Sequence, residues 1–200
     1  MAEVKCSIAV SADGFVTGEP QSREAPFGHA GERLHEWMFA DPVDPLDAPI
    51  IDEIVDGFGA FVMGRRMFDS GSGPWDTSWT GFWGDDPPYH GPVFVLTHHE
   101  REPLPMEGGT TFVFVTDGIE SALEQAQEAA GGKDVSVTGG ADTVNQFLAA
   151  GLLDELHLHV VPITLGHGQR IFDGVGELRL EAVSVVASPT VTHVRYRPQR

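Results

Sequence analysis

Short apolar segments of strand length alternate with amphipathic segments of helical period along most of the chain. Helices are predicted at residues 32–39, 50–58, 118–130 and 143–150, where apolar positions recur three and four residues apart. Asp117 and Glu120 have the spacing of an N-terminal capping box. Strands are predicted at residues 5–10, 60–63, 93–97, 111–115, 135–138 and 155–161. This alternation is typical of an α/β protein with a mostly parallel sheet that helices cover on both faces.

Two further segments complete the predicted architecture. Residues 178–187 and 190–196 read as a β-hairpin, which would add an antiparallel edge to the sheet. Residues 69–91 form a long loop that contains Trp75, Trp79 and Trp83. These rings either stack on a planar ligand or anchor the loop on the core or a second subunit, and the anchoring role is favoured. With a prior of ~150 residues per domain, residues 1–200 are expected to form a single domain.

The charge balance limits the classes of partner. The chain carries 12 Lys and Arg against 30 Asp and Glu, a formal net charge of −18. Such a surface repels phosphate backbones and anionic lipids, so neither a nucleic acid nor a membrane surface is expected as partner. A single cysteine, Cys6, excludes an intrachain disulfide. The N-terminal segment lacks a signal-peptide pattern, so we expect a cytoplasmic protein.

Candidate chemistry lies at the ends of three predicted strands. Gly139 and Gly140 separate one strand from a helix, an arrangement that brings a ligand close to the backbone and to free N–H groups. Arg65 and Arg66 follow Gly64 at the end of another, and guanidinium groups suit phosphate monoesters. The hydroxyl of Thr97 and the imidazole of His98 stand at the end of the third. Each pattern alone is equally compatible with a tight turn or with surface ion pairs. Since parallel strands bind ligands at their carboxyl ends, the coincidence favours one shared site.

The ordered segments 7–16, 62–68, 135–143, 162–168 and 171–172 resemble the dihydrofolate-reductase-like superfamily. Within it, the chain is most similar to the reductase domain of the riboflavin-biosynthesis deaminase-reductase and to stand-alone relatives of that domain. The resemblance extends over about residues 4–196. It implies a single-domain three-layer sandwich, a homodimer, and hydride transfer from NADPH to a small planar heterocycle or a carbonyl compound.

The resemblance also implies a set of cofactor-binding residues. The nicotinamide would lie against Ala9 and Val10, while Thr97 and His98 would flank the 2′-phosphate with Arg65. The pyrophosphate would rest on the segment after the double glycine, and the segment 166–172 would close the cleft. The complete set is Ala9, Val10, Gly64, Arg65, Arg66, Met67, Thr97, His98, Gly139, Gly140, Ala141, Asp142 and Thr143.

The substrate-binding residues are less well defined. Glu36, in the first predicted helix, and Asp13, in an Asp-Gly turn, are the candidate catalytic carboxylates, although an Asp-Gly pair after a strand is more often a purely structural turn. This ambiguity leaves a non-catalytic nucleotide-binding protein as the alternative. His157 and His159 share one strand face and would begin a zinc-hydrolase site. No third ligand follows at a suggestive spacing, so no metal site is expected.

Overall fold

The computed structural model describes residues 2–199, and its centre is a parallel sheet. Six strands pair side by side in the order β8-β1-β7-β3-β4-β6, and every pair is parallel. Their bounds are Val4–Ser11 (β1), Phe58–Gly64 (β3), Pro92–Leu96 (β4), Thr111–Val115 (β6), Asp134–Gly139 (β7) and Glu155–Val161 (β8). The mostly parallel α/β sheet expected from the sequence is confirmed.

Antiparallel strands extend this sheet at both edges. A hairpin of β10 (Arg179–Ala187) and β11 (Thr192–Gln199) joins through β11 to β8, and β5 (Leu104–Pro105) pairs with β6 at the other edge. A separate small sheet pairs β2 (Phe15–Thr17) with β9 (Gln169–Arg170). The hairpin was predicted from the sequence, whereas the strands β2, β5 and β9 are too short to show a recognisable sequence pattern.

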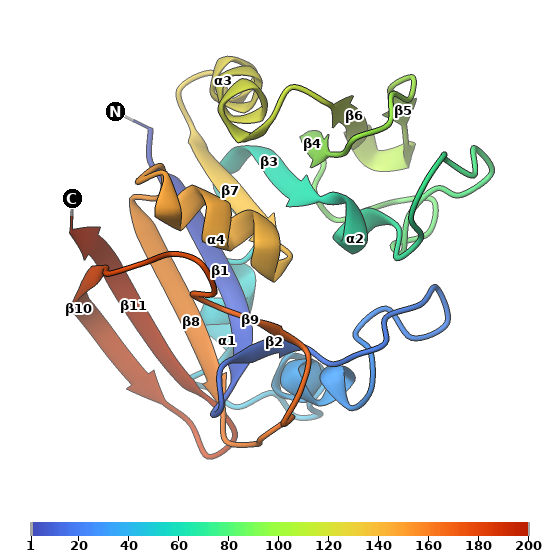
Figure 1. The fold of residues 1–200 in the computed structure, drawn as a ribbon. Coiled ribbons are helices and arrows are strands. Elements are labelled where there is room, and N and C mark those ends of the chain that lie inside the picture. Colours follow the sequence, from blue (N-terminus) through green and yellow to red (C-terminus); the bar gives the residue numbers. More distant parts are fainter. Residues whose placement is uncertain (1, 200) are drawn as a thin grey trace.

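Helices and loops cover the two faces of the sheet and produce three layers (Figure 1). On one face lie α3 (Ile119–Ala130) and α4 (Ala141–Ala149), whose apolar stripes pack on β1, β3, β7 and β8. The 3₁₀ helix η1 (Gly31–Phe39) and α1 (Ala48–Asp52) pack with Ala9 of β1 and Val161 of β8 in a second core. Two shorter elements are α2 (Arg65–Phe68) and the 3₁₀ turn η2 (Glu107–Gly109).

Two local predictions were wrong, and a third was confirmed in a different helical form. The helix predicted at residues 50–58 is confined to α1, because Phe58 enters β3 beside Asp134. The first predicted helix is a 3₁₀ helix rather than an α-helix. The predicted capping box is not formed, since Gly118 is the N-cap of α3, with φ 93°, and no side chain caps this end. A backbone turn that favours glycine therefore begins this helix.

An aromatic cluster fixes the long loop. Trp75, Trp79 and Trp83 pack around the buried residues Phe68 and Phe112 in a third core. The indole Nε1 of Trp79 donates a hydrogen bond to the carbonyl oxygen of Phe68 at 2.8 Å. The anchoring role favoured for these tryptophans is therefore confirmed within this chain.

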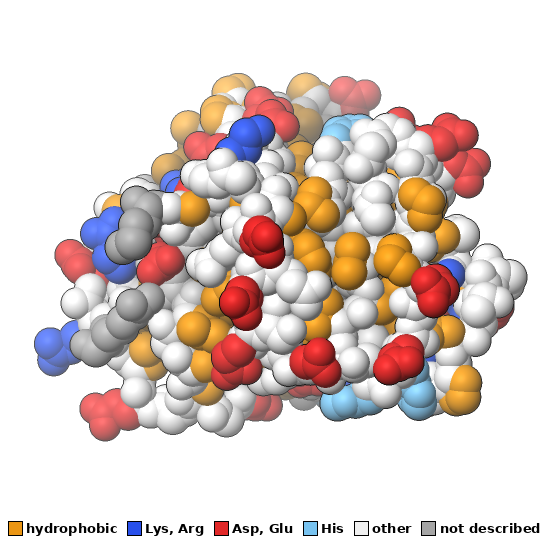
Figure 2. Space-filling model, turned by 90° about the horizontal axis from the view of Figure 1, so that it is seen from above, with side chains coloured by type: hydrophobic (Ala, Val, Ile, Leu, Met, Phe, Trp, Pro, Cys, Tyr) orange, Lys and Arg blue, Asp and Glu red, His pale blue; other side chains and the backbone are white. Residues whose placement is uncertain are grey.

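The surface reflects the acidic composition. Figure 2 shows acidic side chains spread over the face seen from above, with the few basic ones mainly near one edge. Among residues 2–199, none of the helices has the length and apolar character that crossing a bilayer requires.

Phe112→Ala tests the aromatic core. The ring is 0% exposed and lies 4.9 Å from that of Phe68, between ring centroids, so truncation leaves a cavity. We expect the free energy of unfolding to fall by about 3–5 kcal/mol in urea denaturation. Phe39→Ala is the matched control, because Phe39 is 79% exposed and its loss should change stability by less than about 0.5 kcal/mol. Equal effects of the two substitutions would contradict this packing.

Candidate functional site

Four neighbouring parallel strands, β7, β3, β4 and β6, end at the same edge of the sheet and open a cleft there. The cleft has a volume of about 380 Å³. Its lining comes from the last residues of these strands and the segments that follow them: Gly64, Arg65 and Arg66 at the end of β3; Leu96, Thr97, His98 and His99 at the end of β4; Val115, Thr116, Gly118 and Ile119 at the end of β6; and Gly140, Asp142, Thr143 and Gln146 after β7. The convergence of the three predicted strand-end motifs on one site is thus present in the structure.

The double glycine joins β7 directly to α4. Gly139 has φ 127°, a conformation that L side chains rarely adopt, and Gly140 is the N-cap of the helix. The peptide bond between them is cis. Gly140 lines the cleft, so the N–H groups at the start of α4 lie beside it, and the N-terminus of α3 reaches the same cleft through Ile119. Two helix N-termini give this cleft a local positive potential that suits an anion.

Arg65 provides a positive charge held by an aromatic ring. Its guanidinium carbon lies 3.9 Å from the centroid of the Trp75 ring, and the Nε1 of Trp75 donates to the carbonyl oxygen of His99 at 2.7 Å. The Nε of Arg65 is buried and has no hydrogen-bond partner. Burial lowers the pKa of Arg65, but an arginine stays charged at neutral pH. Arg65 lines the cleft, so its guanidinium group supplies a positive charge at the cleft wall.

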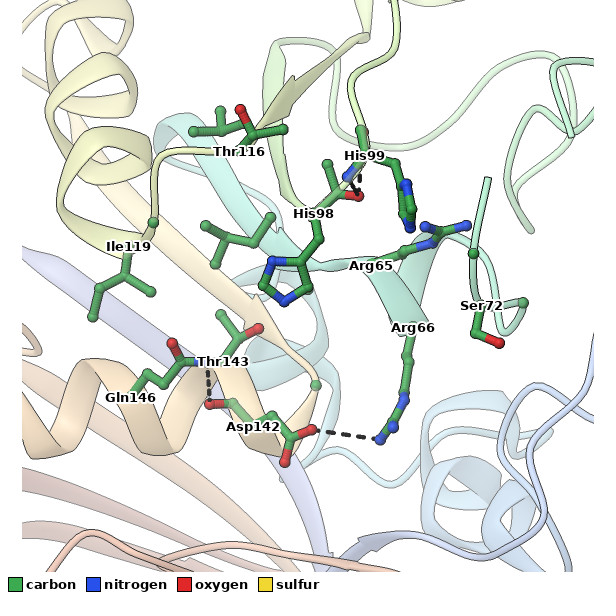
Figure 3. Close-up of a pocket in the computed structure, with 18 of the residues that line it drawn as sticks. Arg65, Arg66, Ser72, His98, His99, Thr116, Ile119, Asp142, Thr143 and Gln146 are labelled. Carbon is green, nitrogen blue, oxygen red and sulfur yellow. Dashed lines mark hydrogen bonds and ion pairs between the residues drawn. The ribbon is translucent and has the colours of Figure 1, made fainter. Parts of the chain in front are cut away.

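Arg66 lies beside Arg65 but makes a weaker contact. Its Nη1 is 3.4 Å from Oδ2 of Asp142, and both side chains are mostly exposed. Figure 3 shows Arg66 directed toward Asp142, and His98 extending toward Thr143 and Gln146 at the start of α4. Exposed ion pairs contribute little stability. Arg66 is therefore free to exchange Asp142 for a ligand anion.

The segment after β4 contributes one buried and one exposed group. Thr97 is 8% exposed, and its Oγ1 accepts a hydrogen bond from the backbone N–H of His99 at 3.1 Å. His98 is exposed and lines the cleft. Thr97 thus shapes the turn, while the ring of His98 is available to a ligand.

Eight of the thirteen residues predicted to bind the cofactor line this cleft: Gly64, Arg65, Arg66, Thr97, His98, Gly140, Asp142 and Thr143. Three others are packed beside it. A Cβ atom built on Gly139 would lie 3.5 Å from Sδ of Met67, and Ala141 is buried at the start of α4. Ala9 and Val10 of β1 are buried farther along the sheet, where Ala9 packs with η1.

The two candidate catalytic carboxylates lie outside the cleft. Asp13 accepts hydrogen bonds from Ser11 Oγ at 2.6 Å and from the backbone N–H groups of Leu165 and Gly166. The Ser11 hydrogen bond, followed by those from the backbone, lowers the pKa of Asp13. The carboxylate oxygens of Asp13 accept hydrogen bonds that hold two loops together. This is the structural role that its Asp-Gly turn had offered as the alternative to catalysis. Glu36 is exposed on η1 and lines neither this cleft nor the smaller pocket beside Asp13.

Sequence reasoning missed several lining residues. Thr116, Gly118 and Ile119 follow β6 and begin α3, which is the same strand–turn–helix pattern as at the double glycine. That signal was available from the sequence. Ser72 reaches the cleft from the long loop and Gln169 from β9, and neither left a local signal. A third histidine beside His157 and His159 was also missed, because strand pairing between β8 and β11 places His193 opposite His159.

Residues 2–194 match the family model of the RibD C-terminal domain. The chain belongs to this family. It is 25% identical over 175 residues to the uncharacterized protein YyaP of Bacillus subtilis strain 168, a match that covers 82% of this chain and 77% of YyaP.

Solved structures show the same fold. One is a protein provisionally assigned to riboflavin biosynthesis in Shewanella sp. PV-4, with a TM-score of 0.67, 23% identity and 99% coverage of both chains. Another is the dihydrofolate reductase of Enterococcus faecalis complexed with NADP(H), with a TM-score of 0.57 and 14% identity over 99% of this chain and 97% of that one. The RibD C-terminal-like domain therefore has the dihydrofolate-reductase-like architecture that its motifs indicated.

Gly64→Ala tests the close contact at the floor of the cleft. A Cβ atom on Gly64 would collide with Oγ1 of Thr143, which is buried at the start of α4. We expect a loss of about 1–3 kcal/mol in the free energy of unfolding, as for other overpacked sites. The double variant Gly64→Ala, Thr143→Ala removes the colliding oxygen and should recover most of the loss in the same denaturation experiment. Simple additivity of the two single effects would show that the contact is not formed.

Proposed function

We propose that this RibD C-terminal-like protein is an NADPH-dependent reductase of a small planar nitrogen heterocycle, of pyrimidine or pterin type, or of a carbonyl compound. The observation that carries the proposal is the cleft in which two helix N-termini and a partnerless buried guanidinium nitrogen converge. Membership of the RibD C-terminal family and the likeness to a reductase fold support it. The net charge of −18 makes a local anion site in this chain all the more distinctive.

The residues present fit a phosphorylated dinucleotide. Gly140 carries no side chain where the backbone borders the cleft, so a pyrophosphate has room to approach the N–H groups of α4. Arg65 offers a guanidinium group at the cleft wall for the phosphate on the ribose, and Arg66 has a second guanidinium beside it. We infer that these two arginines distinguish NADPH from NADH, because only the former carries that phosphate.

When bound, the nicotinamide supplies a hydride to an electrophilic carbon of the substrate. The chain's own part is to bind, orient and exclude water. α3 and α4 offer preorganised N–H dipoles, and Trp75 holds the guanidinium of Arg65 in place before any ligand arrives. Prepositioned charges lose little conformational entropy on binding, so the cleft is suited to holding a cofactor tightly.

A second candidate function is nucleotide binding without catalysis. It is favoured by one observation: both candidate carboxylates lie outside the cleft, and Asp13 is engaged in structural hydrogen bonds. Oxidation of NADPH over a panel of pterins, oxidised pyrimidines and carbonyl compounds separates the two functions. Turnover with any of them supports the reductase, while binding of NADPH without turnover across the panel supports the alternative.

Arg65→Gln tests the cofactor and its phosphate specificity. We expect isothermal titration calorimetry to show NADPH binding to the wild type more tightly than NADH. The substitution should weaken NADPH binding by about tenfold or more, the equivalent of one hydrogen bond to a charged group. NADH affinity should hardly change, and Arg66→Gln should act in the same direction but less strongly.

Arg33→Gln is the matched control for this experiment, because Arg33 is an exposed arginine of η1 that does not line the cleft. It should bind NADPH as the wild type does. Absence of NADPH binding to the wild type, or an equal loss in the control, would refute the proposed site.

A further inference from the structure

Three buried histidines lie together on the face of the sheet opposite to α3 and α4. His157 and His159 are two residues apart on β8, so their side chains share one face of the sheet. His193 of β11 pairs directly with His159. One ring nitrogen from each of the three lies within 4.8 Å of the other two. Their residues are 7%, 2% and 1% exposed, which is unusual for three adjacent imidazoles.

The outer nitrogens of two of these rings are held by oxygen atoms. Nε2 of His193 lies 3.0 Å from Oδ1 of Asp47, a carboxylate that is 1% exposed. Nε2 of His159 lies 2.7 Å from Oγ of Ser7. Metal-binding histidines characteristically donate their second ring N–H to a carboxylate or another oxygen, which fixes the ring and its tautomer. Both rings therefore already have the outer partners that a metal site requires.

The inner nitrogens of the same two rings face each other. Nδ1 of His159 is 2.7 Å from Nδ1 of His193, a distance at which one nitrogen donates its proton to the other. Trp37 of η1 covers both rings, with centroid distances of 5.1 and 4.9 Å. Two nitrogens bound to one tetrahedral zinc ion lie about 3.3 Å apart. For both nitrogens to bind one ion they would separate by roughly 0.6 Å (3.3 − 2.7), and the shared proton would move from Nδ1 of His159 to its Nε2, which would then donate to Oγ of Ser7.

A simple hydrogen-bond chain does not explain why His157 is buried beside the other two histidines. The chain Ser7–His159–His193–Asp47 is complete without it. Within residues 2–199, the ring of His157 makes contacts with the other two rings but no hydrogen bond. Its place beside the other two rings is therefore not required by the hydrogen-bond chain.

We propose that His157, His159 and His193 bind one divalent transition-metal ion of the zinc class. In this site Asp47 orients His193 and Ser7 orients His159. Imidazole nitrogen is a preferred ligand of zinc and of the neighbouring ions cobalt, nickel and copper, whereas calcium and magnesium require oxygen. Three protein ligands leave a fourth position for water.

The charges around the cluster are compatible with a cation. Asp47 supplies one buried negative charge that neutralises part of the ion's charge. Arg195 lies close by, but it is paired with Glu53 at 2.6 Å and with Glu155 at 3.3 Å, so its charge is balanced locally. The ion would tie β8 to β11, and so would fasten the C-terminal hairpin to the parallel sheet. None of the three histidines lines the cleft of the proposed cofactor site, so the two proposals are independent.

The test uses the full chain without a histidine tag, stripped with a chelator and then dialysed against zinc or cobalt. We expect one zinc per chain by elemental analysis, a rise in thermal unfolding temperature, and the visible absorption of tetrahedral cobalt. X-ray absorption at the zinc edge should show three imidazole ligands. Binding that saturates at one zinc per chain, with three imidazole ligands, would establish the site without any variant.

His157→Gln is the decisive variant, because it removes a ligand and leaves the hydrogen-bond chain intact. Its circular dichroism spectrum without metal should match that of the wild type. Its zinc affinity should fall by more than about 10–100-fold, which is the loss expected when only a residue that orients a ligand is removed. His90→Gln, at an exposed histidine outside the cluster, should keep full affinity. Substoichiometric zinc in the wild type, fewer than three imidazole ligands, or unchanged affinity in His157→Gln would overturn the proposal and leave the cluster as a hydrogen-bond network.

Discussion

The parallel pairing of β7, β3, β4 and β6 is the constraint on which the cleft depends. Strands that run in one direction must end at one edge, so the segments after all four strands are brought side by side. Two of those segments begin the longer helices, α3 and α4, whose unpaired N–H groups then point into the same space. The positive potential of the cleft follows from this topology before any side chain is considered.

The side chain of Arg65 adds to this positive potential, and the aromatic core around Phe68 and Phe112 holds it in place. Phe68 and Phe112 anchor the long loop, the loop carries Trp75, and Trp75 holds Arg65 against the cleft wall. A cation in this position would otherwise be drawn to one of the many carboxylates of an acidic protein. Stacking on an indole satisfies the face of the guanidinium while leaving a nitrogen without a partner. Packing in the core thereby prepares a binding site at the surface.

The other half of the sheet depends on buried polar groups rather than on aromatic packing. The hydrogen-bond chain from Ser7 through His159 and His193 to Asp47 crosses β1, β8 and β11 and reaches the start of α1. Each buried polar atom in such a chain must find its partner, because an unpaired one costs about 1–3 kcal/mol. The chain therefore fixes the register of the antiparallel hairpin on the parallel sheet.

Local sequence was sufficient for the elements whose pattern is self-contained. The alternation of apolar strands and amphipathic helices predicted the α/β sheet, and Gly139, Gly140, Arg65 and Arg66 marked the strand ends that line the cleft. The prediction of a helix up to residue 58 failed where a distant contact decides, since Phe58 joins β3 beside Asp134. The hydrogen bonds of Asp13 to a loop more than a hundred residues away likewise left no local signal in the sequence. The sequence by itself therefore determined most of the longer strands and helices, and which of the strands end in the glycines and arginines that line the cleft. Only the tertiary structure decided that Trp75 supports Arg65 and that His193 joins His157 and His159, because strand pairing and packing between distant segments have no local signature in the chain.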